Sequence, residues 1–437
     1  EVDHKVVAAQ AIGRELFLRA TRLRQPAEAL AAVPLATALN AHVRNDVGMY
    51  ANFLNSVGVV YGSSMKLEDA RRSFEAAQAL REAHGQQNSL GGLDTLANLV
   101  EIANIENRED ESVALARKVV AVSGPMLGDH HPKHVRHLTT LGGGLVDIGR
   151  PNEARGVLGR AEKELATVGS AVVRVLAYSC LGHLELADGD LVAAREYYEK
   201  ENTNAADYTD YIYRTQTQLA KVVALEGDET TARRQFTEAL AQREKQAGVE
   251  DPDYLHGQAM YADALVDLNH PGEAVSQLEP LLTRCAETDL PPWVVYICAK
   301  LRRTLGRAQD RLGDADAAER TWTLARDEYT QVLPPGHFDR MEVAFMLGDL
   351  ALRRRRFPEA VRWLREAEAG YAASAEPDYA PLSIVRLALA RALTGDDASA
   401  PAEAVELADR ARAGLAAKGP MFAADAQAAE AFVRAQR

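Results

Sequence analysis

Cysteine and aromatic residues are scarce in this sequence. The 437 residues include three cysteines, and aromatic residues make up 6% of the chain. Cys180, Cys285 and Cys298 lie far apart within apolar patterns of helical spacing, so we expect buried free thiols rather than disulfide bridges. Free thiols fit a reducing compartment, and the sequence therefore predicts a cytoplasmic protein.

The chain also lacks the signals of a membrane-spanning or secreted protein. No stretch of about 18 residues is both apolar and free of charge. The first ten residues, EVDHKVVAAQ, do not place a basic segment before an apolar one. The sequence thus predicts no contact with a membrane. Because it begins without methionine, we expect a fragment of a longer protein or the removal of a tag.

An excess of positive charge is absent as well. The formal net charge is -13, which argues against nonspecific binding of the whole surface to nucleic acid or anionic lipid. The motifs HExxH, GxxxxGK[ST], paired CxxC and GxSxG do not occur. We therefore expect no cofactor, no nucleic acid partner and no catalytic activity.

A repeat of about 42 residues is present along nearly the whole sequence. A small residue recurs at intervals of 38 to 44 residues, in the range typical of helical solenoids. It opens the second half of an expected helical hairpin each time. The recurring residues are Ala29, Ala70, Ser112, Ala154, Ala194, Ala232, Ala274, Ala318, Ala360 and Ala404.

Each unit carries two further positions with a packing role. A small residue in the first helix lets the second helix approach closely, and a bulky residue in the second helix fills the space between hairpins. The small position is occupied by Gly58, Gly142, Gly182, Ala220, Ala262, Gly306, Gly348 and Ala390. The bulky position is occupied by Phe74, Leu158, Tyr198, Phe236, Leu278, Trp322 and Leu364. The unit around Ser112 departs from this pattern, with Val100 and Ala116 at the two positions.

This pattern resembles the tetratricopeptide repeat, in the long form found in kinesin light chains and many bacterial regulators. The resemblance implies an all-α, right-handed α-solenoid of about ten stacked antiparallel helical hairpins with a C-terminal capping helix. We expect one solenoid over residues 1–437. Residues 1–46 would form an atypical first repeat, 47–420 the repeats, and 421–437 the capping helix.

In tetratricopeptide arrays the first helix of each hairpin lines the concave face. Polar residues at places two, five and nine of each unit are therefore expected to face a bound partner. Several basic residues occupy these places in the middle and later units, and tyrosines occur near the same units. The candidate binding residues are Asn52, Asn55, Arg136, Arg214, Lys221, His256, Lys300, Arg303 and Arg307. The tyrosines are Tyr208, Tyr211, Tyr213, Tyr254, Tyr261 and Tyr296.

Two interpretations of the basic stretch remain open at this point. Its side chains either pair with acidic residues of the adjacent hairpins, or they capture an acidic or C-terminal peptide segment. Asp310, one helical turn beyond Arg307, could pair with that arginine or narrow the site.

The sequence favours a non-catalytic scaffold or regulatory module that binds a protein or peptide in its concave groove. By family analogy, the partner is a kinase, protease or signalling protein of the same polypeptide or operon. An alternative is a peptide-responsive sensor that changes superhelical shape. A third hypothesis is a metal-dependent enzyme that uses His130, His131, His134 and His137, although Pro132 interrupts regular helix there and favours a solvated loop.

Overall fold

A computed structural model describes residues 2–23, 25–205, 209–287, 289–397 and 399–436. Within these ranges the elements are 21 α-helices and three short 3-10 helices, with no strand. No helix of the described chain is long and apolar enough to cross a membrane. The all-α class expected from the sequence is confirmed.

The chain divides into two compact units, residues 1–144 and 145–437. Unit 1 packs its helices as successive hairpins around cores that include Leu16, Phe53 and Phe74. Helix α3 starts at Val47. The helices of this unit are α1 (Val2–Thr21), α2 (Pro26–Asn40), η1 (Ala41–Val43), α3 (Val47–Ser63), α4 (Leu67–Ala83), α5 (Leu90–Ile105) and α6 (Glu109–Leu127), and α7 (Pro132–Asp147) crosses the boundary.

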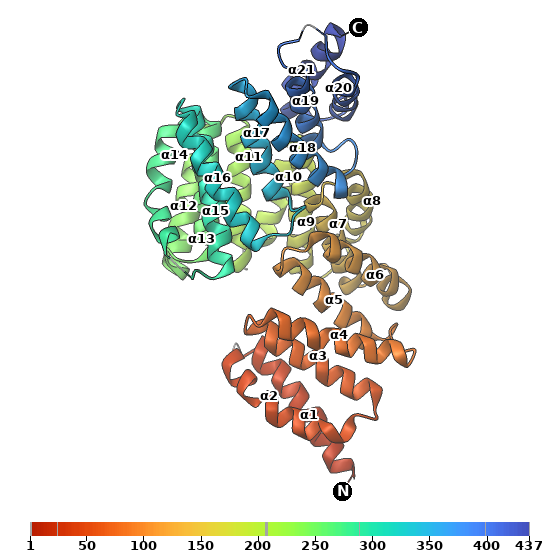
Figure 1. Cartoon of the computed structure of the whole chain (residues 1–437). Helices are drawn as coiled ribbons and strands as arrows, with labels where there is room; N and C mark the ends of the chain where they lie inside the picture. The colour runs from red at the N-terminus through yellow and green to blue at the C-terminus, as the bar shows by residue number, and fades with distance from the viewer. Residues whose placement is uncertain (1, 24, 206–208, 288, 398, 437) are drawn as a thin grey trace. The chain divides into compact units, whose positions relative to one another are not determined.

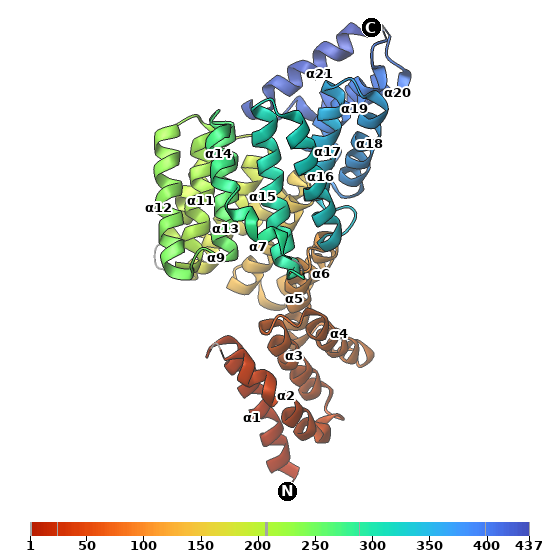
Figure 2. The same ribbon diagram turned by 60° about the vertical axis from the view of Figure 1, so that its left-hand side comes forward.

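Unit 2 continues the same alternation of first and second helices, which lie side by side in Figures 1 and 2. Its helices are α8 (Pro151–Glu164), α9 (Ala171–Ala187), α10 (Leu191–Ala205), α11 (Thr209–Leu225), α12 (Glu229–Ala247), α13 (Pro252–Asp267), α14 (Pro271–Leu278), η2 (Leu281–Ala286), α15 (Pro292–Arg311), α16 (Ala315–Val332), α17 (Phe338–Arg353), α18 (Phe357–Ser374), α19 (Ala380–Thr394), α20 (Ala402–Leu415), η3 (Pro420–Phe422) and α21 (Ala423–Ala435).

The turn inside each hairpin from α3/α4 onward uses one residue with positive φ. This residue follows the first helix. In the turns before Gly395 the next backbone N–H bonds back across the turn, as Lys66 does to the carbonyl of Tyr61 at 2.9 Å. Glycine or asparagine occupies most of these positions because they tolerate the left-handed conformation. The nine residues are Met65, Asn107, Gly149, Gly189, Gly227, Asn269, Gly313, Arg355 and Gly395.

The small and bulky positions of the repeat meet as expected. A β-carbon at Gly58 would lie 2.6 Å from the Phe74 ring, and one at Gly182 would lie 2.6 Å from the ring of Tyr198. All ten small residues that open the second helices are at most 3% exposed. In the irregular unit, Val100 and Ala116 are both buried, so a larger first-helix residue accompanies a smaller second-helix residue. The hairpin packing is therefore that of the predicted repeat.

First helices form the inner face of unit 2. Successive first helices contact one another, as α11 does α13 and α13 does α15, whereas contacts between successive second helices are fewer in the described chain. A curved stack is crowded on its inner side, which assigns α9, α11, α13, α15, α17 and α19 to the concave face.

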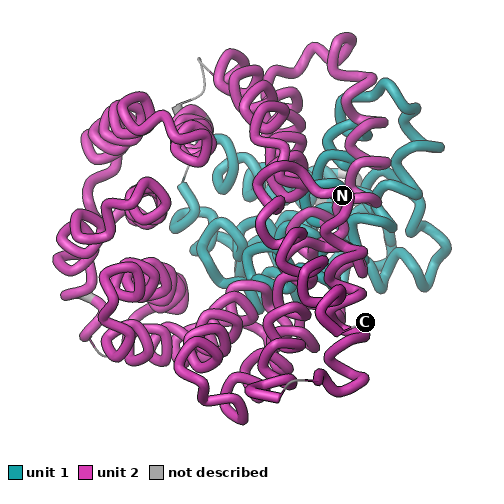
Figure 3. Tube along the Cα trace, turned by 90° about the horizontal axis from the view of Figure 1, so that it is seen from above, with its two compact units in different colours: residues 1–144 teal, residues 145–437 magenta. Residues whose placement is uncertain are grey.

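Unit 2 also contacts its own beginning, through a set of bonds that we call the clasp. Glu376 accepts hydrogen bonds from the backbone N–H groups of Asn152 and Glu153 at 3.0 Å each, at the N-terminus of α8. Lys418 pairs with Asp188 at 2.9 Å, and the Gly419 N–H donates to the Asp188 carbonyl. These bonds join segments about 225 residues apart, and Figure 3 shows the tube of unit 2 curving accordingly.

The expected capping helix is present as α21, which follows η3 and packs on α20.

The cysteine prediction is wrong for two residues. Cys285 of η2 and Cys298 of α15 form a disulfide, because the turn after α14 folds back onto α15, while Cys180 is free. Burial raises the pKa of Cys180 to about 12. The disulfide removes the basis on which a reducing compartment was expected.

Candidate functional site

The inner face of unit 2 is described by three places on each first helix. They lie six residues before, three residues before and one residue after the small residue of that helix, and correspond to places two, five and nine of the repeat. Reading them on every first helix from α9 to α19 returns acids as well as bases. The titratable residues there are His183, Arg214, Lys221, His256, Asp263, Lys300, Arg303, Arg307, Glu342, Asp349 and Arg391.

Arg303 and Arg307 form a salt-bridge ladder with the hairpins on either side. Arg303 lies 2.9 Å from Asp263 of α13 and 2.6 Å from Glu342 of α17. Arg307 lies 2.5 Å from Asp263 and 2.7 Å from Asp267. Burial opposes ionisation of Asp263, but the two arginines hold its pKa below its usual value. Both arginines are therefore already neutralised.

Asp310, one turn beyond Arg307, does not take part in this ladder. It pairs instead with Arg353 of α17, at 2.9 Å. Arg303 and Arg307 therefore follow the first of the two interpretations, in which basic residues pair with acidic residues of the adjacent hairpins.

Three other cations of the inner face differ from these arginines. We call Arg214 and Lys221 of α11 and Lys300 of α15 the cation cluster. Among the side chains that the structure describes, no carboxylate lies within 4.0 Å of their charged nitrogens. The Lys300 ammonium lies 4.9 Å from the ring centroid of Tyr296. Within the described side chains, this part of the predicted basic stretch therefore has no carboxylate in salt-bridge contact.

Two histidines face the cation cluster and are kept neutral. Burial and the charges of Lys300, Arg214, Arg303 and Lys221 together lower the pKa of His256 to about 3, and burial has the larger effect. Burial likewise lowers the pKa of His183 to about 4, with contributions from Lys221 and Arg214. Burial also lowers the pKa of Lys300, partly countered by Asp339. The cluster therefore produces a positive potential that an anion would relieve.

In unit 1 the structure brings together two predicted binding residues and leaves a third apart. Asn55 and Arg136 line a hollow of about 390 Å³ with Asp94 and His137. Asn55 accepts a hydrogen bond from Asn98 at 3.0 Å, and Lys133 pairs with Asp94 at 3.0 Å.

Asn52 has a structural contact instead. It accepts a hydrogen bond at 2.6 Å from Arg81, which is 1% exposed. A buried guanidinium needs such acceptors, so Asn52 supports the packing of α4 against α3.

The solvated loop that the sequence suggests is present at His130 and His131, which are exposed, whereas His134 and His137 lie in helix α7. Helix α7 starts at Pro132, so His130 and His131 precede it. His134 is fully buried, and its Nδ1 lies 2.8 Å from the hydroxyl of Ser123. No group of three or more metal-ligating side chains gathers anywhere in the described part of the chain.

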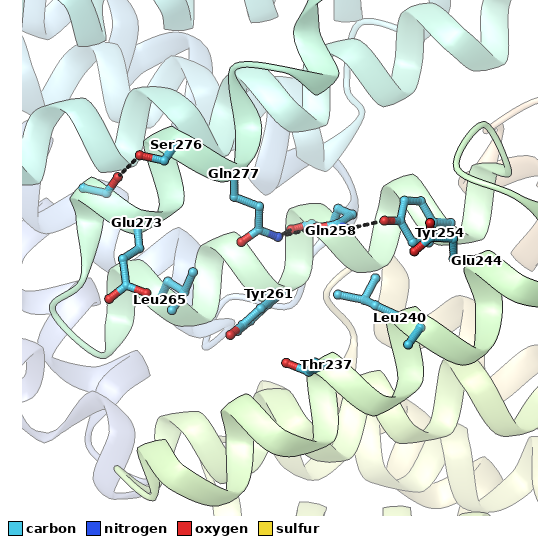
Figure 4. Close-up of a pocket in the computed structure, with 12 residues that line it drawn as sticks. Thr237, Leu240, Glu244, Tyr254, Gln258, Tyr261, Leu265, Glu273, Ser276 and Gln277 are labelled. Carbon is cyan, nitrogen blue, oxygen red and sulfur yellow. Dashed lines mark hydrogen bonds between the residues drawn. The ribbon is translucent and has the colours of Figure 1, made fainter.

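Another hollow, which belongs to unit 2, lies between α12, α13 and α14 (Figure 4). Helix α14 spans eight residues, which leaves part of α13 uncovered next to it. Tyr254, Gln258 and Tyr261 of α13 line the hollow, and Gln258 bonds Gln277 and the hydroxyl of Tyr254. Glu244 and Glu273 are the charged residues of its lining. It is thus distinct in charge from the cation cluster.

Asp263 and Glu342 are the site residues that were missed from the sequence. They occupy the same places as the basic residues and could have been found by reading acids and bases together. The hydroxyl of Tyr296, one of the tyrosines named from the sequence, donates a hydrogen bond to Asp339 at 2.8 Å. Tyr208 lies outside the described residues, as does the side chain of Tyr211.

Comparison with known proteins places this architecture among helical repeat proteins. No family model matches the chain. No curated protein matches it either. Among solved structures, the apo form of the quorum sensor NprR from B. thuringiensis is similar, with a TM-score of 0.55 and 12% identity over 72% of this chain and 87% of that one.

Two further solved structures have lower TM-scores. A Rap protein complexed with competence and sporulation factor has a TM-score of 0.49 and 14% identity over 79% of this chain and 99% of that one. A Podosopora anserina kinesin light chain with nearly identical TPR-like repeats has a TM-score of 0.36 and 22% identity over 46% and 94%. The likeness to NprR shows a shared fold, and the packing of small against bulky residues within the hairpins is that of a tetratricopeptide-like repeat.

Proposed function

We propose that the inner face of unit 2 binds an acidic segment of a peptide or protein, without catalysis. One observation carries the proposal: Arg214, Lys221 and Lys300 face the same concavity without carboxylate partners, whereas Arg303 and Arg307 beside them are paired. With a net charge of -13, the protein has more carboxylates than basic side chains. Cations left unpaired in a concave site therefore favour a role in binding an external anion.

The charge pattern also limits what the site accepts. The neutral state of His256 and His183 near pH 7 follows from pKa values of about 3 and 4. An anion bound beside them would stabilise their protonated forms, so binding is expected to strengthen as the pH falls toward 5. A cationic ligand would meet the opposite trend.

Charge reversal tests the proposal directly. The probe is a fluorescein-labelled, blocked decapeptide of alternating Glu and Gly, compared with the same peptide carrying Gln. We expect the double variant Lys221→Glu, Lys300→Glu to lose at least tenfold in affinity for the acidic probe by fluorescence anisotropy. The matched control Lys163→Glu, Lys245→Glu makes the same change of net charge at exposed lysines of α8 and α12. Equal affinity of the two variants would exclude the cation cluster as the site.

A second candidate function is a sensor whose shape responds to a bound peptide. The clasp favours it, since unit 2 is held in its curvature by a few bonds between segments far apart in sequence. Small rotations between hairpins add along such a stack. A sensor is expected to change its radius of gyration in small-angle X-ray scattering when the acidic probe binds, whereas a scaffold keeps it. The protein partner in either case is proposed to be a signalling protein of the same polypeptide or operon.

A further inference from the structure

A small aromatic hollow lies on the same inner face as the cation cluster. It has a volume of about 370 Å³ and is enclosed by α17, by Tyr371 and Tyr379, and by the start of α19. Glu342 and Phe345 of α17 and Ile384 of α19 occupy inner-face places of their hairpins. The hollow therefore opens toward the concave side.

The walls of the hollow are held in place by contacts between aromatic rings. Phe338 meets Tyr371 edge to face at a centroid distance of 4.8 Å and stacks on Tyr379 at 5.6 Å. A β-carbon at Gly149 would lie within 3.0 Å of Tyr379 and Phe338, so the backbone at Gly149 packs against the rings at the back of the hollow. The rings are thus fixed before any ligand arrives. Preformed apolar hollows with few polar groups are typical of binding sites.

Several apolar side chains of the hollow remain partly exposed. Phe338, Phe345, Met346, Tyr379 and Ile384 are each half-buried, although they lie together. Burying them against a ligand side chain would add apolar contact that the protein alone does not provide.

Asp339 connects the hollow to the cation cluster. Its carboxylate lines the hollow and accepts the hydrogen bond of Tyr296, whose ring lies under the Lys300 ammonium. Glu342, on the same rim, is bound by Arg303 at 2.6 Å. A ligand that reaches from Lys300 into the hollow therefore passes two carboxylates that can accept its backbone N–H groups.

We infer that the site selects a peptide in which a large apolar side chain lies next to a carboxylate. The apolar side chain occupies the aromatic hollow, and the neighbouring carboxylate, from Asp, Glu or a C-terminus, pairs with Lys300. This inference rests on the proposed function, because it adds side-chain selectivity to the binding of an acidic segment. Charge complementarity at Lys300 and the rings of the hollow together define the ligand.

A thermodynamic cycle with four blocked, labelled hexapeptides tests the inference. The parent is Gly-Gly-Phe-Asp-Gly-Gly, and the others replace Phe by Ala, Asp by Asn, or both. Isothermal titration calorimetry gives the affinity of each for the wild-type protein and for three variants. Lys300→Met removes the cation, Phe345→Ala removes a wall of the hollow, and Ile384→Trp fills the hollow.

We expect Phe345→Ala and Ile384→Trp each to weaken the Phe peptide at least tenfold and to change the Ala peptide less than twofold. Lys300→Met is expected to weaken the Asp peptides tenfold and to leave the Asn peptides unchanged. Two variants that alter the hollow in opposite ways, both folded by circular dichroism, separate ligand contact from damage to the fold.

The outcomes distinguish this inference from the proposed function. If Lys300→Met discriminates Asp from Asn but neither hollow variant discriminates Phe from Ala, the aromatic selectivity is wrong and acidic binding stands. If no peptide binds the wild-type protein at millimolar concentration, the inference is overturned. The decapeptide anisotropy experiment then decides whether the proposed function is lost with it.

Discussion

The salt-bridge ladder and the cation cluster occupy the same inner face but differ in charge balance. In the ladder, Arg303 meets three carboxylates within 4.0 Å and Arg307 meets two, and Asp263 serves both arginines. In the cluster, Arg214, Lys221 and Lys300 meet none among the described side chains. Basic residues at neighbouring positions of one repeat thus either form salt bridges between hairpins or keep an unbalanced charge. Which of the two occurs depends on whether the adjacent hairpin places an acidic residue within reach of the cation.

The largest expected effect comes from breaking the ladder at its shared carboxylate. Asp263→Asn keeps the shape of the side chain but leaves two half-buried guanidinium groups short of a partner. Removing one member of a buried ion pair costs about 3 kcal/mol of unfolding free energy. Urea denaturation followed by circular dichroism measures this loss. A loss below about 1 kcal/mol would show that the ladder does not hold α13, α15 and α17 together.

The next largest effect is a pH dependence of stability from His256, whose pKa is lowered by burial and by the charges of the cation cluster. Its pKa is about 3 in the folded protein, below the usual 6.5, so the unfolded chain binds the proton more tightly between these values. Unfolding free energy is therefore expected to fall as the pH drops from 6.5 toward 3, by about 2 kcal/mol at pH 4.5. His256→Gln flattens this slope in urea titrations at pH 7 and 4.5. An unchanged slope in His256→Gln would contradict the assignment.

A smaller effect of opposite sign is expected at Lys300. Because its charge has no carboxylate partner in the described structure and burial lowers its pKa, removing the charge relieves an unfavourable interaction. Lys300→Met is expected to raise the unfolding free energy by about 1 kcal/mol at pH 7. Thermal unfolding compares it with Lys245→Met at an exposed site, which should be neutral. Destabilisation by Lys300→Met would place this residue with the ladder rather than the cluster.

The smallest effect belongs to an exposed ion pair outside the ladder, where Arg353 pairs with Asp310 and Asp349. The guanidinium is 47% exposed, and exposed pairs contribute little because solvent screens them. Arg353→Gln is expected to cost about 0.5 kcal/mol or less in urea denaturation. Raising the salt concentration to 1 M should remove the difference from the wild-type protein. A cost as large as that of Asp263→Asn would contradict the expectation that exposed ion pairs contribute less to the unfolding free energy than buried ones.

Much of the fold could be predicted because each repeat is specified locally. The contact of Gly58 with Phe74 and the positive φ of Gly149 follow from residues within one hairpin. The same small-and-bulky pattern then recurs every 42 residues or so, and stacking buries each hairpin against the next. Helix boundaries and the order of hairpins were accordingly within reach of the sequence.

The candidate site was only partly predictable, because proximity along the chain does not reveal it. Arg303 lies 40 residues from Asp263, and Glu376 lies 223 residues from Glu153. The disulfide of Cys285 with Cys298 depends on how the turn after α14 folds back. A prediction that considered only the basic residues at the inner-face places could not separate the cations that form salt bridges from those that do not.

Periodicity, hairpin turns and the inward places of each first helix are properties of short segments, so the amino-acid order was enough to establish them. Which cations stay unpaired, how unit 2 returns to Gly149, and where the aromatic hollow opens all depend on the angles at which hairpins stack. Those angles result from many weak contacts between neighbouring repeats. Electrostatic balance at Lys300 and Arg303 then follows from distances of a few ångströms, which only the folded chain sets.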